Sequence, residues 1–148
     1  MERFFTKSAA MLFPIREVNG KTEILLQQRK GWAAGKWDAA VGGHVDANEP
    51  MTACVQREAK EEIDIEISKD DIIFVNIQHN ISKDSIYYDG HFFIKGFKGT
   101  PRICEPDKIG DLRWFDIDNL PDNMIDRRLQ AIIDFKNGVT YTEFGWDK

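Results

Sequence analysis

Residues 42–65 read GGHVDANEPMTACVQREAKEEIDI, and in this stretch a pair of glycines precedes a segment rich in carboxylates. From Pro50 to about Ile63 the apolar residues recur at helical spacing, which predicts an amphipathic helix. Proline suits the first turn of such a helix, because the N–H that it lacks would have no partner there.

Three glutamates lie off the apolar stripe of this helix, namely Glu58, Glu61 and Glu62. Residues three and four apart are neighbours on a helix surface, so the three carboxylates can gather in one patch. Clustered carboxylates repel one another, and a bound cation would remove that cost. Oxygen ligands of this kind suit Mg²⁺, Mn²⁺ or Ca²⁺ better than zinc. The alternative is a solvated surface, since runs of charge commonly face water.

Residues on either side of the cluster fit a bound cation or phosphate. Arg57 lies beside the glutamates, and Glu49 could pair with it and fix the preceding loop against the helix. Gly42 and Gly43 would let the backbone approach a metal ion or a phosphate more closely than a side chain allows.

The spacing of these residues resembles the signature of the Nudix hydrolases, which is Gly, five residues, Glu, seven residues, Arg-Glu, an aliphatic residue, any residue, Glu-Glu, any residue, Gly, and an aliphatic residue. The corresponding residues here are Gly43, Glu49, Arg57, Glu58, Ala59, Glu61, Glu62 and Ile65. Asp64 stands where the family has its second glycine. A non-glycine residue in the left-handed conformation costs roughly 1–2 kcal/mol, with Asp and Asn penalised least.

This resemblance implies an α/β/α sandwich in which a mixed, partly curled sheet lies between the catalytic helix, at about 50–63, and a C-terminal helix. It also implies a hydrolase that depends on Mg²⁺, with Mn²⁺ as the alternative. Its expected partner is a small-molecule nucleotide, a nucleoside di- or triphosphate or a related nucleoside diphosphate derivative, whose phosphoanhydride bond is cleaved. Clearance of damaged nucleotides is one such activity.

The resemblance further implies roles for single residues. The metal ligands would be Gly43, through its carbonyl, with Glu58, Glu61 and Glu62. Glu58 would also activate or orient the attacking water, Arg57 would orient Glu58, and Glu49 would hold Arg57. The loop Glu105-Pro106-Asp107-Lys108 resembles a MutT-type loop whose carboxylate completes the metal site or acts as base. Asp107 is the expected residue and Glu105 the alternative, while an ordinary polar turn around Pro106 is the competing interpretation.

Four residues are candidates for contacting the substrate. Arg29 ends a predicted strand and could meet phosphates, and Trp32 lies in a loop with glycines and could stack on a base. His44 lies beside Gly43. Asn123 resembles the MutT-type residue that reads a base edge, although an N-cap of the following helix is the preferred interpretation. The core is expected to contain Trp37, Trp114 and Trp146.

Outside this stretch, the sequence predicts further strands and one more helix. Asn19-Gly20 is a strong hairpin turn between the first two strands. We expect strands at about 8–16, 23–29, 71–78, 87–97 and 112–115, and a helix at about 123–136. Strands on both sides of an amphipathic helix indicate the α/β or α+β class.

Composition argues against several classes of protein. The chain has 148 residues, with 20 Lys and Arg against 25 Asp and Glu, and the net charge of −5 argues against a binder of duplex nucleic acid. No apolar run approaches the roughly 20 residues that cross a bilayer. The two cysteines fit neither a disulfide framework nor a zinc site. We therefore expect a soluble, cytoplasmic protein with one domain over residues 1–148, as a monomer or homodimer.

Several alternatives remain at this point. Other substrates of the resembled family are ADP-ribose, nucleotide sugars and dinucleoside polyphosphates. A different class of function is a catalytically silent module that binds nucleotide, and the complete set of three glutamates argues against it. Replacing Glu62 by glutamine separates the two, because an enzyme would lose turnover whereas a sensor could keep binding without metal.

Overall fold

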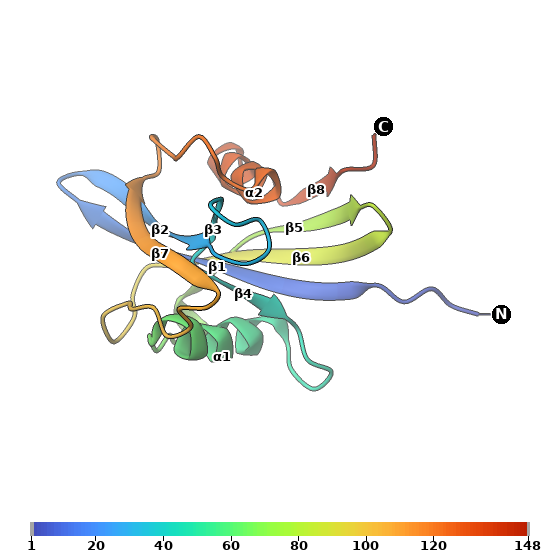
Figure 1. Cartoon of the computed structure of the whole chain (residues 1–148), viewed down its shortest axis with the longest axis horizontal. Coiled ribbons are helices and arrows are strands. Elements are labelled where there is room, and N and C mark those ends of the chain that lie inside the picture. The colour runs from blue at the N-terminus through green and yellow to red at the C-terminus, as the bar shows by residue number, and fades with distance from the viewer. Residues whose placement is uncertain (1, 148) are drawn as a thin grey trace.

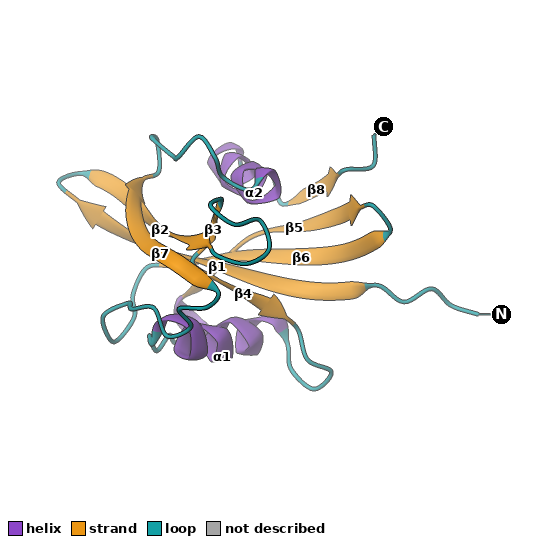
Figure 2. Ribbon diagram, viewed as in Figure 1, coloured by secondary structure: helices purple, strands orange, loops and turns teal. Residues whose placement is uncertain are grey.

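The computed structural model describes residues 2–147, and within them a mixed sheet of eight strands carries a helix on each face (Figure 1). In chain order the elements are β1 (Lys7–Val18), β2 (Lys21–Arg29), β3 (Trp37–Ala39), β4 (Val41–His44), α1 (Met51–Ile63), the 3₁₀ helix η1 (Lys69–Asp71), β5 (Ile72–Ser82), β6 (Ser85–Ile94), β7 (Ile109–Asp116), α2 (Asp126–Asn137) and β8 (Tyr141–Phe144). Helix α1 covers one face of the sheet and α2 the other, so the predicted sandwich is confirmed (Figure 2).

The long strand β1 organises the sheet. Its first part pairs with β4 in antiparallel and with β6 in parallel orientation, and residues 15–18 pair in antiparallel orientation with β2. The strand order is β3-β2-β1-β6-β5-β8, with β7 added to β2. As predicted, Asn19 and Gly20 form the β1–β2 turn, and both adopt positive φ angles, 52° and 78°. This is the conformation that a tight hairpin requires.

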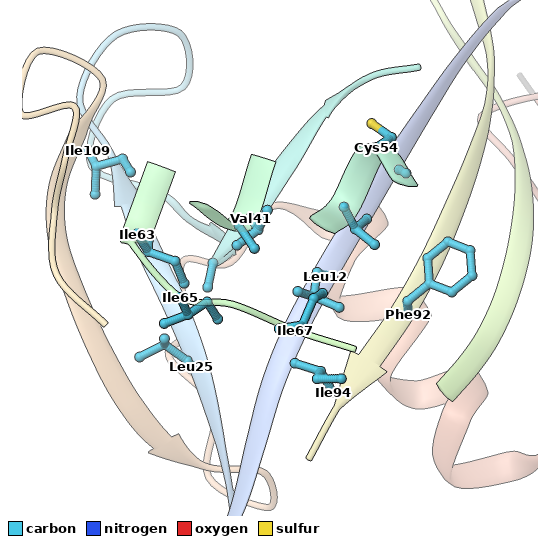
Figure 3. Close-up of a cluster of buried hydrophobic side chains, with 14 residues drawn as sticks. Leu12, Leu25, Val41, Cys54, Ile63, Ile65, Ile67, Phe92, Ile94 and Ile109 are labelled. Atoms are coloured by element: carbon cyan, nitrogen blue, oxygen red, sulfur yellow. The ribbon is translucent and has the colours of Figure 1, made fainter. Parts of the chain in front are cut away.

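Side chains of β1 alternate between two hydrophobic clusters. Ala10 and Leu12 point to the α1 side, whereas Met11, Phe13 and Ile15 point to the α2 side. Since helices cover both faces, nearly every residue in the middle of β1 is buried, and the sequence there is a continuous apolar run. Figure 3 shows the α1-side cluster, in which Leu12 lies among side chains from several elements. This cluster anchors α1 through Cys54, Val55, Ala59 and Ile63.

The two helices end in the same way. Asp64 caps α1 in the left-handed conformation, with φ 58° and ψ 45°, and its N–H contacts the carbonyls of Ala59 and Lys60. Gly138 caps α2 at φ 68°. A left-handed residue after the last turn satisfies backbone groups that would otherwise have no partner.

Two local predictions are wrong. Asn123 is not a helix N-cap, because α2 begins at Asp126 and the Asn123 side chain donates to the Gly35 carbonyl at 2.8 Å. Trp146 is 41% exposed and therefore not in the core.

The other two tryptophans that were expected in the core lie in it or against it. Trp37 is buried, and the half-buried Trp114 packs against the α1-side cluster. The short strands β3, β4 and β8 were not predicted. No helix within residues 2–147 is long and apolar enough to span a bilayer.

Candidate active site

A cavity of about 930 Å³ lies at the carboxylate patch of α1. One end is lined by the glycine pair and by Glu58, Glu61 and Glu62, and the other end by Trp32 and residues of α2. Both ends belong to the same hollow. The structure therefore brings the sequence-predicted carboxylates together with three of the four candidate substrate contacts, which are Arg29, Trp32 and His44.

Arg57 contacts several carboxylates at this end of the cavity. Its Nη2 and Nε contact the two oxygens of Glu49 at 2.7 and 3.2 Å, and its Nη1 donates to Glu58 Oε1 at 2.7 Å. A longer contact of 3.5 Å joins Nη1 to Glu61. The hydrogen bond from Arg57 lowers the pKa of Glu49 to about 2, and the same contacts raise the pKa of Arg57. Glu49 therefore ties the loop before α1 to the helix, as expected from the spacing.

Glu62 lies in different surroundings from the other two glutamates. Its side chain is buried, with 7% of the residue exposed, and the Gly42 N–H points to its Oε2 at 3.3 Å. Burial is the main cause that raises the pKa of Glu62 to about 9, and the neighbouring Glu58 carboxylate adds to it. Without a cation, two carboxylates beside each other in a buried place favour the protonated form of one of them.

Gly43 lets the Glu58 side chain approach the backbone closely. A Cβ atom at this position would stand 2.6 Å from Glu58 Oε1, which is closer than real contacts allow. The Cys54 thiol approaches the Gly43 carbonyl at 3.8 Å from the core side, and burial raises its pKa to about 12. Cys54 is thus a packing residue with a protonated thiol, and the Gly43 backbone lies directly against the Glu58 carboxylate.

The three glutamate side chains of α1 are not arranged around one point. Within residues 2–147 no group of three or more His, Cys, Asp or Glu side chains takes an arrangement that could hold a metal ion. Arg57 draws Glu58 and Glu61 to its guanidinium, whereas Glu62 faces Gly42.

The acidic loop before β7 brings Glu105, rather than Asp107, to the cavity. Glu105 lines the cavity and contributes to the raised pKa of Glu62, whereas Asp107 is exposed and does not line it. Backbone hydrogen bonds from Cys104 to Glu62 and from Arg102 to Ile63, each 3.0 Å, attach this loop to the end of α1. The structure thus places the sequence-based alternative next to the glutamates.

The candidate substrate contacts lie at the rim. Trp32 is 61% exposed, and the guanidinium groups of Arg29 and Arg127 lie 5.6 and 5.7 Å from the centre of its rings. His44 Nε2 is 2.9 Å from the Tyr87 hydroxyl. Asn123 does not line the cavity, because its amide holds the loop that carries Trp32.

Sequence reasoning missed several polar residues that line the cavity, and five of them come from β2, β3, β6 and α2. They are Gln27, Asp38, Asp89, Arg127 and Arg128. A signal was available for the arginines, which interrupt the apolar pattern of the second helix as an adjacent pair. No signal in the sequence links residues from β2, β3 and β6 to that helix, because only the fold brings these elements together.

A comparison with protein families shows to which family the chain belongs. The family model described as NUDIX domain matches residues 6–135. The chain belongs to the Nudix family. Two of its relatives in this family are named as hydrolases.

Individual Nudix proteins are similar to this chain at low identity. The NAD-capped RNA hydrolase NudC of Stutzerimonas stutzeri (strain A1501) is 31% identical over 99 residues, which cover 67% of this chain and 34% of that protein. The chain thus spans about a third of the length of the curated relatives it matches.

Solved Nudix structures agree with the fold. The MutT NUDIX hydrolase from Burkholderia pseudomallei matches with a TM-score of 0.76 and 27% identity, over 88% of this chain and 98% of that one. The NUDIX domain of Shewanella oneidensis NrtR, solved with ADP ribose, matches with a TM-score of 0.73 and 17% identity, over 93% and 91% of the two chains. At that identity the second likeness concerns the fold alone.

Proposed function

We propose that this Nudix chain is a Mg²⁺-dependent pyrophosphohydrolase that cleaves a phosphoanhydride bond in a nucleoside di- or triphosphate or a related nucleoside diphosphate derivative. The observation that carries the proposal is one cavity that has carboxylates at one end and, at the other, an exposed tryptophan with two arginines near its ring. A charged phosphate chain fits the first end together with a cation, and a flat base fits the second.

The donor atoms of the carboxylate end suit Mg²⁺ or Mn²⁺. Every available donor is an oxygen, which is the ligand type these ions prefer. Glu62 supports this fit, because a buried carboxyl whose pKa rises to about 9 beside a second carboxylate gains most from a neighbouring cation. Because Gly43 has no Cβ, the Glu58 carboxylate can lie against the backbone at this position. The residues that would hold the ion are Gly43, Glu58, Glu61, Glu62 and Glu105.

Residues of the chain have separate roles in the proposed hydrolysis. When bound, the ion neutralises phosphate charge and lowers the pKa of water at the site. Glu58 accepts the proton of the attacking water at the oxygen that Arg57 does not contact, and Arg57 fixes the orientation of that carboxylate from its other side. Glu49 holds Arg57 through two hydrogen bonds and so keeps this geometry in place. Arg29 lies at the rim, where it can bind the phosphate chain.

The substrate class is tested with a panel of compounds. The panel contains nucleoside di- and triphosphates, an oxidised purine triphosphate, ADP-ribose, a nucleotide sugar and a dinucleoside polyphosphate. NAD-capped RNA is included because it is the substrate named for the Stutzerimonas relative. Product release is followed with Mg²⁺, with Mn²⁺ and with a chelator. We expect turnover of one class of compound in the presence of metal and none with the chelator.

Glu62→Gln tests the metal site itself, with Glu66→Gln as the matched control. Glu66 lies just beyond α1, and its exposed carboxylate pairs only loosely with Lys60, at 3.6 Å. We expect Glu62→Gln to lower turnover about tenfold or more, and Glu66→Gln to leave it unchanged. If a folded wild-type protein turns over no compound yet binds a nucleotide with and without metal, the proposal is wrong and the chain is a silent binding module.

A further inference from the structure

Residues 98–104 run antiparallel to the chain at the end of α1. The N–H of Glu66 donates to the Lys98 carbonyl at 3.0 Å, and the Lys98 N–H donates back at 2.9 Å. Further along, the N–H groups of Arg102 and Cys104 donate to the carbonyls of the last two residues of α1, each at 3.0 Å. Carbonyls at a helix end have no partner within the helix, so these contacts satisfy them and fix the register of the segment.

Arg102 is attached to the helix end at two points. Besides the hydrogen bond of its backbone N–H, its side-chain Nε lies 3.1 Å from Asp64 Oδ2. The other carboxylate oxygen of Asp64 lies 3.0 Å from Lys60 Nζ, one turn back in α1. Within residues 2–147, the Asp64–Arg102 contact is the only hydrogen bond or ion pair between side chains that joins residues 98–104 to α1 and its cap.

This ion pair depends on the residue at which the chain departs from the Nudix signature. Asp64 stands where the signature has glycine, and glycine has no side chain that could contact an arginine. Asp64 nevertheless takes the left-handed conformation that suits glycine, with φ 58°. The backbone path at the helix end is therefore kept, and the carboxylate adds a partner for the segment that leads to Glu105.

Glu105 follows this segment directly, and after Glu105 the chain is attached to a different element. Lys30, the residue after β2, donates its N–H to the Lys108 carbonyl and its Nζ to the Pro106 carbonyl, each at 3.0 Å. The N–H of Lys108 donates in turn to the Glu105 carbonyl at 3.0 Å. None of these partners belongs to α1. The contacts before Glu105 are therefore the ones that set its position relative to the glutamates of the helix.

We propose that Arg102 is a positioning residue for the proposed metal site, and that its ion pair with Asp64 holds the Glu105 carboxylate beside Glu62. Both glutamates line the same cavity. The inference rests on the proposed function, because it concerns Glu105 as one of the residues that would hold the ion. The side chains of Arg102 and Asp64 are 65% and 34% exposed. Exposed ion pairs contribute little, so we expect an effect of about two- to fivefold on metal affinity.

The test measures Mn²⁺ binding to the metal-free protein without nucleotide, from the electron paramagnetic resonance signal of the free ion. Arg102→Gln is compared with Lys60→Gln, its matched control. Each substitution removes one positive charge and one ion pair of Asp64, at 3.1 and 3.0 Å, but only Arg102 belongs to the segment before Glu105. We expect Arg102→Gln to weaken Mn²⁺ binding about two- to fivefold, and Lys60→Gln not to weaken it. Equal affinities of the two variants would overturn the proposal.

The sign and the coupling of the effect separate positioning from general electrostatics. Loss of a positive charge by itself favours a bound cation, so weaker binding by Arg102→Gln is opposite in sign to that effect. Arg102→Lys keeps a cation that can pair with Asp64, and we expect it to bind Mn²⁺ like wild type. Glu105→Gln should itself weaken Mn²⁺ binding, and in that background Arg102→Gln should cause no further loss, because the segment acts through the Glu105 carboxylate. Equal losses from Arg102→Gln in both backgrounds, or no loss from Glu105→Gln alone, would contradict the inference.

Metal binding and turnover are separate measurements. The Arg102 side chain is exposed, so its substitution is expected to leave the fold intact, and circular dichroism of each variant checks this. If the wild-type protein hydrolyses a nucleotide with Mg²⁺ while Arg102→Gln binds Mn²⁺ as Lys60→Gln does, this inference is wrong and the proposed function stands. If the Mn²⁺ affinities follow the expected pattern but no compound is hydrolysed, the inference stands and the proposed function is wrong.

Discussion

Glu62 and Glu49 show how the surroundings of a single carboxyl change its chemistry. Arg57 contacts Glu49 through two nitrogens, and its hydrogen bond lowers the pKa of Glu49 to about 2. Glu62 has no such cation beside it, and burial next to Glu58 raises its pKa to about 9. The two glutamates look alike in the sequence, but only one of them is left without compensating positive charge.

The raised pKa of Glu62 predicts how stability depends on pH in the metal-free protein. Because its folded pKa of about 9 exceeds the ordinary glutamate pKa of 4.5, the folded state holds a proton that the unfolded state releases between these pH values. Stability from this group is therefore complete below pH 4.5 and is lost as pH rises toward 9. We expect Glu62→Gln to be more stable than wild type by roughly 1–3 kcal/mol at pH 8, and by little at pH 4.

Urea unfolding with a chelator present measures this difference. Added Mg²⁺ should reverse it, because the wild-type carboxylate then gains a partner that the amide cannot match. A constant gap between the two proteins at pH 4 and pH 8 would show that Glu62 does not titrate in this way.

The end of α1 is the element whose sequence departs from the Nudix signature. Asp64 adopts the left-handed conformation that the signature glycine would adopt easily, and its carboxylate contacts Lys60 at 3.0 Å and Arg102 at 3.1 Å. Gly99 fits against this turn, since a Cβ there would stand 2.9 Å from the Asp64 carbonyl. The loop that carries Glu105 is thus attached to the helix end despite the substitution.

Two substitutions at Asp64 separate the backbone from the ion pairs. Asp64→Gly and Asp64→Ala both remove the carboxylate, so the difference between them reports the cost of the left-handed conformation. We expect Asp64→Ala to be less stable than Asp64→Gly by about 1 kcal/mol in urea unfolding. Equal stability of the two variants would mean that the helix end relaxes to another conformation.

Across the whole molecule, a polar network connects the C-terminal strand to the cavity. Thr142 in β8 donates to Asp134 in α2, and Asp134 accepts from Asn76 in β5. The network continues through His91 in β6 to Arg128 on the cavity floor. Strand β8 therefore does more than extend the sheet beside β5, because it helps to fix α2 over that face.

Thr142→Val removes one end of this network without changing the side-chain shape. We expect a loss of about 1–2 kcal/mol in stability, because the buried Asp134 carboxylate loses one hydrogen bond. Thr140→Val is the matched control, since Thr140 is exposed and its side chain forms no hydrogen bond within residues 2–147. Thermal unfolding of both variants measures the effect, and equal midpoints would contradict the role assigned to Thr142.

The sequence by itself determined the longer elements and the carboxylates at one end of the cavity. Helix α1, the β1–β2 hairpin and the positions of Arg57 and the glutamates follow from short-range spacing, which a local pattern records completely. Short-range spacing did not decide whether Asp107 or Glu105 lies at the cavity, because that depends on how a loop attaches to the end of α1.

Only the tertiary structure decided the far end of the cavity. Gln27, Asp38, Asp89 and Arg128 come from four elements, and the sheet order and the packing of α2 bring them together. Neither local propensity nor motif spacing contains that information. Asn123 is a second residue whose role the local sequence did not indicate. Its amide donates to the Gly35 carbonyl, a partner 88 residues away in the chain. Contacts at such distances depend on the complete fold, and a local sequence pattern does not record them.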